Sequence, residues 1–231
     1  MTTVHELEIP RPATPVPADF EVAENGKFPA SAYPDAGAYF IGYARELARA
    51  ATSVEGSLLD RAASILLEAY TRGARVFSCG NGGSAAIANH MQCDQVKGLR
   101  TGTDLTPRFV SLSSNIEVLT AIANDLAYED VFSYQLQSQA GPGDVLVAVS
   151  SSGRSANIVG ALTWAKDNGL ATIALTGFAG GDARTLADVA IHVDSANYGI
   201  IEDLHQAITH ALAQYLRQSR MAPDAISSSI F

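Results

Sequence analysis

The chain is poor in cysteine, and its acidic residues outnumber its basic ones. Only Cys79 and Cys93 are present, too few for a disulfide framework, so a reducing cytoplasm is the expected compartment. Against 24 acidic residues stand 15 lysines and arginines, which gives a net charge of −9. A basic nucleic-acid-binding face is therefore not expected, and an anionic ligand must be held by local donors.

Long apolar runs are also missing. No uninterrupted stretch approaches the ~20 residues of a membrane helix, and the opening MTTVHELEIPRPATPVPADF lacks the basic start and apolar run of a signal peptide. We expect no membrane association. The Pro-rich residues 1–35 suit an extended arm, either a mobile tail or a strap across a neighbouring subunit, and 36–231 suit a single domain.

Two kinds of hydrophobic pattern follow one another along this domain. Residues 36–72 have helical spacing, with an apolar stripe that includes Leu58, Leu66 and Tyr70, and predict a pair of helices that ends near Gly73. Short apolar runs then alternate with helical stretches, at 74–79, 108–113, 144–150, 171–177 and 188–194. This alternation predicts a doubly wound α/β fold, with a five-stranded parallel sheet covered by helices on both faces.

Two segments at predicted strand ends suit a phosphate. In GNGGS, the glycines 80, 82 and 83 follow a strand and precede a helix, so backbone N–H groups and a helix N-terminus can face an anion. In SSSGRS, the residues Ser150, Ser151, Ser152 and Ser155 crowd a second strand-to-helix junction. Helix capping explains one or two of these serines, and an oxyanion site explains all four.

Histidines and carboxylates suggest a second kind of chemistry. His90 and Asp94 share a helix face, and His210 lies in a later helix with Glu202, His205 and Gln206. Such residues can hold a zinc-like ion or move protons beside a carbonyl. Glu202 and His210 are about 12 Å apart along a regular helix, so Gln206 would meet His210 more easily. For Cys93 we expect a buried thiol rather than a ligand, and for His205 a structural role.

Together these motifs resemble the sugar isomerase (SIS) family, and within it the phosphoheptose isomerases. The resemblance covers about residues 36–218 and includes GNGGSAA, TAIANDLAYEDVF, GDVLVAVSSSGRSANIV and the helix of His210. It implies a homotetramer with zinc that acts on a phosphorylated sugar. Carried over by position, the residues that bind substrate are Asn81, Ser84, Asn124, Asp125, Ser150, Ser151, Ser152, Ser155 and Glu202; the catalytic pair is Asp94 and His210; the metal ligands are His90, Asp94, Glu202 and His210.

Several positions depart from the family pattern. Asp94 stands where a catalytic glutamate is usual, so its shorter side chain calls for a backbone shift or a different substrate carbon. Glu202 replaces a ligand glutamine and adds a negative charge. Gly199 and Gly98 stand where an acidic and a basic residue are common, although Lys97 adjoins the second.

The resemblance implies an aldose–ketose isomerase that converts sedoheptulose 7-phosphate through an enediol. The departures from the family pattern indicate a specialised branch with altered stereochemistry or substrate. The alternative is a non-catalytic SIS protein that senses a sugar phosphate or acts as an adaptor. Retention of His90, Asp94 and His210 favours the enzyme.

Overall fold

In the computed structural model, residues 27–231 are described, and most of the predicted arm at 1–35 lies outside them. The helical pair is confirmed as α1 (Ala36–Ala51) and α2 (Gly56–Thr71). Asp35 caps α1, because its carboxylate accepts a hydrogen bond from the Ala38 N–H at 2.7 Å. Beyond α2, Gly73 takes a φ of +72°, the left-handed conformation that ends many helices.

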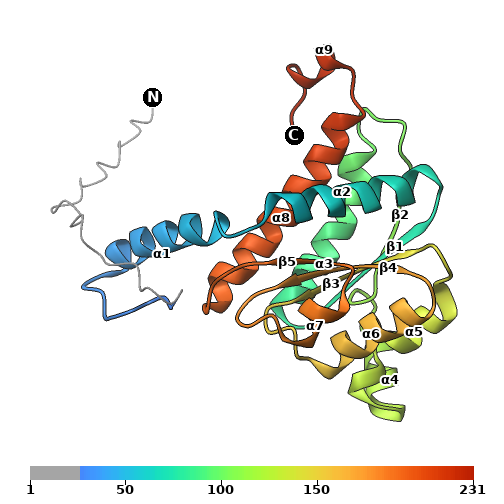
Figure 1. Ribbon diagram of the computed structural model, residues 1–231, viewed down its shortest axis with the longest axis horizontal. Coiled ribbons are helices and arrows are strands. Elements are labelled where there is room, and N and C mark those ends of the chain that lie inside the picture. The colour runs from blue at the N-terminus through green and yellow to red at the C-terminus, as the bar shows by residue number, and fades with distance from the viewer. Residues whose placement is uncertain (1–26) are drawn as a thin grey trace, which may run out of the picture.

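All five predicted strands are present and form one parallel sheet, which confirms the predicted fold class (Figure 1). They are β1 (Arg75–Gly80), β2 (Arg108–Ser111), β3 (Val145–Ser150), β4 (Ala171–Thr176) and β5 (Val189–His192), in the order β2-β1-β3-β4-β5. The strand order reverses between β1 and β3, so the loops after these two strands lie side by side at the carboxyl edge. Doubly wound sheets bind their ligands at this position.

Helices cover both faces of the sheet, and α1 projects from it (Figure 1). The remaining helices are α3 (Gly83–Cys93), the wider π-helical turn η1 (Asp94–Leu99), α4 (Ile116–Asp125), the 3-10 turn η2 (Tyr128–Asp130), α5 (Ser133–Gln139), α6 (Ala156–Asp167), α7 (Gly181–Leu186), α8 (Tyr198–Ser219) and α9 (Pro223–Ile226). Strand residues alternate between two buried cores. Val76 packs with α2, α3 and α8 on one face, and Phe77 packs with α4 to α6 on the other.

The pairing of α3 with α8 positions the site. Both helices lie on the same face of the sheet and pack against one another, through buried residues such as Ile87 and Met91 of α3 and Leu204 and Ile208 of α8. The chain passes from α3 into η1 without a break, so polar residues of 81–98 and of α8 can meet along one seam.

Candidate functional site

A pocket of about 150 Å³ lies where the loops after β1 and β3 meet. Its lining combines the two segments predicted to bind a phosphate: Asn81, Ser84, Val149, Ser150, Ser151, Ser152, Ser155, Tyr198 and Glu202. None of these lining residues is cationic. Donors for an anion must therefore come from hydroxyl and backbone N–H groups.

Two helices begin at this pocket without a side-chain cap. The residue before α3 is Gly82, whose φ of +54° suits glycine, and it has no side chain to accept the first N–H groups. The residue before α6 is Ser155, whose hydroxyl makes no capping hydrogen bond. Both helix starts thus offer N–H groups and a favourable dipole to an anion.

The serine hydroxyls are only partly used within the protein. Ser150 Oγ accepts a hydrogen bond from the Gly153 N–H at 3.1 Å, and Ser152 Oγ accepts one from the Arg154 N–H at 3.3 Å. The buried Ser151 Oγ has no partner among the described residues. Since buried hydroxyls are rarely left unpaired, Ser151 suits a ligand oxygen.

Asn81 is fixed by two residues that sequence reasoning missed. Asn157, only 1% exposed, exchanges two side-chain hydrogen bonds with Asn81, both of 2.9 Å. Tyr128 donates its hydroxyl to Asn81 Oδ1 at 2.9 Å. The position of Asn157, two residues after Ser155 in the SSSGRSAN segment, was the available signal. Asn124 and Asp125 are exposed, bonded to each other, and do not line this pocket.

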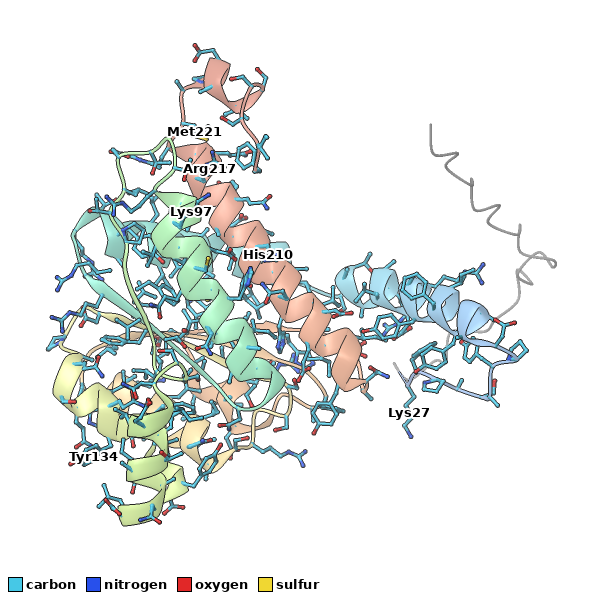
Figure 2. All side chains as sticks on the ribbon, turned by 180° about the vertical axis from the view of Figure 1, so that it is seen from behind. Lys27, Lys97, Tyr134, His210, Arg217 and Met221 are labelled. Carbon is cyan, nitrogen blue, oxygen red and sulfur yellow. The ribbon has the colours of Figure 1, made fainter. Side chains whose placement is uncertain are left out.

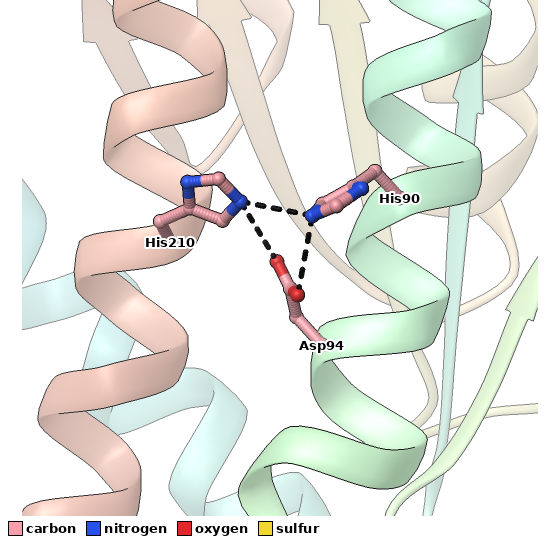
Figure 3. Close-up of side chains that lie close together, drawn as sticks. All are labelled: His90, Asp94 and His210. Atoms are coloured by element: carbon pink, nitrogen blue, oxygen red, sulfur yellow. Dashed lines mark hydrogen bonds and ion pairs between the residues drawn. The ribbon is translucent and has the colours of Figure 1, made fainter. Parts of the chain in front are cut away.

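Farther along α3 and η1, and facing them on α8, His90, Asp94 and His210 come together (Figure 3). The two imidazole Nε2 atoms are 2.9 Å apart. Asp94 Oδ1 lies 3.3 Å from His90 Nε2, and Asp94 Oδ2 lies 3.5 Å from His210 Nε2. These residues include both predicted catalytic residues and three of the four predicted metal ligands.

The cluster fits a divalent cation by its own geometry. One donor atom from each residue lies within 4.8 Å of the others, and Asp94 Oδ2 is buried without a hydrogen-bond partner. Two imidazoles and a carboxylate are a donor set that zinc accepts. Gln206 Nε2 lies 2.8 Å from His210 Nε2, so the expectation that Gln206 meets His210 is confirmed. The wider turn η1 begins at Asp94 itself, where the sequence calls for a backbone adjustment.

Glu202 lies apart from this cluster. Helix α8 is regular from Tyr198 to Ser219, and the Glu202 carboxylate rests over Gly83 at the start of α3, in the serine pocket. A Cβ atom at position 83 would overlap both carboxylate oxygens, so the glycine leaves room for the carboxylate in this position. The structure therefore places Glu202 with the predicted substrate-binding residues and away from the other predicted metal ligands.

Cys93 differs from expectation. Its thiol is free and exposed, because Met91 and not Cys93 is the buried residue of the last turn of α3, whereas Cys79 is buried in β1. The expectation of a buried thiol at position 93 is wrong. Cys93 is also outside the cluster of metal-ligating atoms among the described residues.

His205 is fully buried on the sheet-facing side of α8, and neither ring nitrogen has a well-aligned hydrogen-bond partner among residues 27–231. Burial lowers its pKa from 6.5 to about 4, while the Thr176 backbone and the charge of His192 act more weakly and in opposite directions. Between about pH 4 and 6.5, His205 is therefore protonated in the unfolded chain and mostly neutral in the folded chain.

This difference predicts acid sensitivity. Above pH 6.5 the protonation of His205 does not affect the free energy of unfolding. As the pH falls from 6.5 toward 4, this free energy decreases by up to about 3 kcal/mol. Urea unfolding of wild type and His205→Leu at pH 7.0, 5.5 and 4.5 measures it. We expect a shallower loss of unfolding free energy in the variant; parallel pH profiles would contradict the assignment.

Comparisons with known proteins show which family the chain belongs to. Residues 39–177 match the family model described as SIS domain. The phosphoheptose isomerase of Colwellia psychrerythraea is 38% identical over 170 residues, 72% of this chain and 86% of that protein. That of Mycobacterium tuberculosis (strain ATCC 25177 / H37Ra) is 39% identical over the same shares. The solved phosphoheptose isomerase of Neisseria gonorrhoeae is 31% identical, with a TM-score of 0.71 over 79% of this chain and 96% of that one.

The five-stranded parallel sheet with serine-rich loops at its switch point is thus that of an SIS-domain protein. Within this class, the chain belongs to the phosphoheptose isomerase family. Across residues 27–231, no helix combines the length and the apolar character needed to cross a bilayer.

Proposed function

We propose that this protein is an aldose–ketose isomerase that converts sedoheptulose 7-phosphate to an aldoheptose 7-phosphate. One observation carries the proposal: α3 with η1 and α8 together present an anion pocket at one end and the His90–Asp94–His210 cluster farther along. From Ser84 to His90 the rise along α3 is about 9 Å at ~1.5 Å per residue. An extended sugar can thus place its phosphate in the serine pocket and its carbonyl near the cluster.

The protein's own groups suffice for the proton transfers. Asp94 takes the proton from C1 of the ketose, and His210 gives a proton to the C2 oxygen, which yields the enediol. Transfer of the O1 proton to His210 and of a proton from Asp94 to C2 then yields the aldose. The two groups are 3.5 Å apart and lie on different helices, so they can act on neighbouring substrate atoms.

Zinc is the proposed cofactor, and His90, Asp94 and His210 are the residues that would hold it. A zinc ion would supply a Lewis acid beside the substrate carbonyl. The protein positions that end of the sugar by anchoring the phosphate, and Asn157 with Tyr128 keeps Asn81 oriented toward it. Asn124 and Asp125 remain proposed substrate contacts, as the family resemblance implies.

Incubation of the purified protein with sedoheptulose 7-phosphate in deuterated water, with and without added zinc, tests the function directly. We expect an aldoheptose phosphate in the NMR spectrum, and its C2 signals report the configuration made. A folded protein that binds the sugar phosphate without any turnover would favour the alternative of a sensor or adaptor. The phosphoheptose isomerase relatives give that alternative no support.

The Glu202 carboxylate is expected to weaken phosphate binding, because it shares a pocket with the dianionic group and no lining residue is cationic. Glu202→Gln should lower the Kd for inorganic phosphate and the KM for the sugar phosphate about tenfold. Isothermal titration with phosphate and with zinc separates the two predicted roles. Tighter phosphate binding with unchanged zinc affinity would show that Glu202 acts in the pocket. Weaker zinc binding with unchanged phosphate affinity would show that Glu202 is a metal ligand.

Asp203→Asn is the matched control. Asp203 is the next residue of α8 and carries the same charge, but it accepts a hydrogen bond from the Tyr43 hydroxyl at 2.6 Å and does not line the pocket. This variant should leave the phosphate Kd unchanged. An equal gain in both variants would show a general effect of net charge rather than a local one.

Three further features belong to the proposal. The family resemblance implies a homotetramer, and exposed aromatic residues on the projecting α1, Tyr39 and Phe40, support subunit packing. The free thiols Cys79 and Cys93 support a reducing cytoplasm. The match over residues 39–177 supports a single SIS domain within 36–231.

A further inference from the structure

A second pocket adjoins the catalytic cluster on the side away from the serines. Its volume is about 100 Å³, and its lining residues are Asp94, Gly98, Leu99, His210, Ala213, Gln214, Arg217 and Phe231. Asp94 and His210 thus face both the cluster and this pocket. A substrate whose carbonyl lies at the cluster can direct the atoms beyond the carbonyl into this pocket.

The order of residues along α8 fixes this arrangement. Tyr198 and Glu202 line the serine pocket, His210 belongs to the cluster, and Ala213 and Arg217 line the second pocket. Figure 2 shows Arg217 beyond His210 on this helix, and Met221 just past the end of the helix. Phosphate, reacting carbons and the end of the sugar beyond them would therefore lie in sequence along one seam.

The segment after α8 supplies one wall of the second pocket, and Arg217 holds it there. The guanidinium of Arg217, 9% exposed, donates from Nε to the Thr101 carbonyl and from Nη1 to the Ile230 carbonyl, both at 2.8 Å. It also lies 4.8 Å from the centre of the Phe231 ring. Among the described residues no carboxylate is within ion-pair distance of Arg217. The hydrogen bonds of Arg217 therefore join the segment after α8, at Ile230, to the loop after η1, at Thr101.

The opposite wall leaves room. A Cβ atom added to Gly98 would meet no atom of residues 27–231 within 4 Å, so the described part of the chain leaves the pocket open on that side. Leu99 and Ala213 make an apolar lining, and the Phe231 ring, 45% exposed, forms part of the wall toward solvent. Phe231 is thus the large side chain that limits what fits beyond the reacting carbons.

We propose that this second pocket receives the end of the sugar beyond the carbonyl, and that Phe231 determines how large this end can be, with Arg217 as its positioning residue. This inference rests on the proposed isomerase activity. An apolar pocket discriminates one extra carbon by roughly 10- to 200-fold. Discrimination of this kind is what the ring of Phe231 should supply.

A pair of substrates isolates the effect. Sedoheptulose 7-phosphate and 3-octulose 8-phosphate have the same spacing between carbonyl and phosphate, and the second has one more carbon beyond the carbonyl. Isomerisation of the second moves a proton from C2 to C3 and makes a 2-ketose. We expect Phe231→Ala to raise the ratio of kcat/KM for the octulose to that for the heptulose at least tenfold, and Arg217→Met to raise it in the same direction.

Ile230→Ala and Arg220→Gln are the matched controls. The Ile230 side chain is 93% exposed, and Arg220 pairs with Asp104 outside the pocket. Thermal unfolding confirms that each variant is folded. An unchanged ratio in Phe231→Ala, or an equal change in Ile230→Ala, overturns the inference while heptulose turnover stands. Absence of heptulose turnover in the wild-type protein overturns the proposed function, and this inference with it.

Discussion

Replacing His210 with alanine is expected to abolish isomerisation while phosphate binding is retained. His210 lies 2.9 Å from His90 and 3.5 Å from Asp94, so the variant loses both a proton donor and one of three metal-ligating groups. Loss of a general acid alone typically costs 10²- to 10⁴-fold, and we expect a loss of at least about 10³-fold in kcat/KM. The serine pocket is formed by other residues and should be unaffected.

Three measurements decide the result: turnover by NMR, zinc affinity, and the Kd for inorganic phosphate. Gln218→Ala is the control, because Gln218 is exposed on the same helix beyond the site. A His210→Ala protein that turns over normally would remove His210 from the mechanism. If phosphate affinity fell together with turnover, the variant would have disturbed α8, and the binding and catalytic roles would not be separated.

The fold and the meeting of the two loops that form the serine pocket were predictable because they depend on local sequence. Strand periodicity, glycines at a strand end and clustered serines act over a few residues, and the strand order of a doubly wound sheet brings the two loops together. His90 and Asp94 were predictable as a pair by their spacing on one helix.

The position of Glu202 was not predictable by these means. The resemblance carries a residue's role but not the direction of its side chain, and that direction depends on the space left by Gly83 across the seam. Asn157 and Tyr128 were missed for the same reason. Their importance lies in contacts with Asn81 across long separations in the chain.

The wall of the second pocket is the least local feature. Phe231 lines this pocket because the chain turns back after α9 and Arg217 donates a hydrogen bond to the Ile230 carbonyl. No periodic pattern in the last residues predicts this contact. Tertiary hydrogen bonds of one buried arginine determine it.

Asp94→Asn is expected to cause the second large loss, about 10³-fold or more in kcat/KM, because an amide of the same shape cannot take the proton from C1. Exchange of the C1 proton of the ketose with deuterated solvent reports that step independently of product formation. We expect no exchange in Asp94→Asn, even with zinc at saturation. Full recovery of this exchange on addition of zinc would show that Asp94 acts only as a metal ligand and not as the base. Glu117→Asn, on the exposed start of α4, is the control.

Asp94→Glu then tests whether the backbone is adapted to the shorter carboxylate. The wide turn η1 begins at Asp94, and both Asp94 oxygens already face the histidines, so one more methylene would carry the carboxylate past them. A displacement of about 1 Å can cost on the order of 10²-fold, so Asp94→Glu should fall between wild type and Asp94→Asn. Activity at or above that of wild type would show that η1 does not favour aspartate. In that case the replacement of glutamate at position 94 would need a cause in the substrate rather than in the helix.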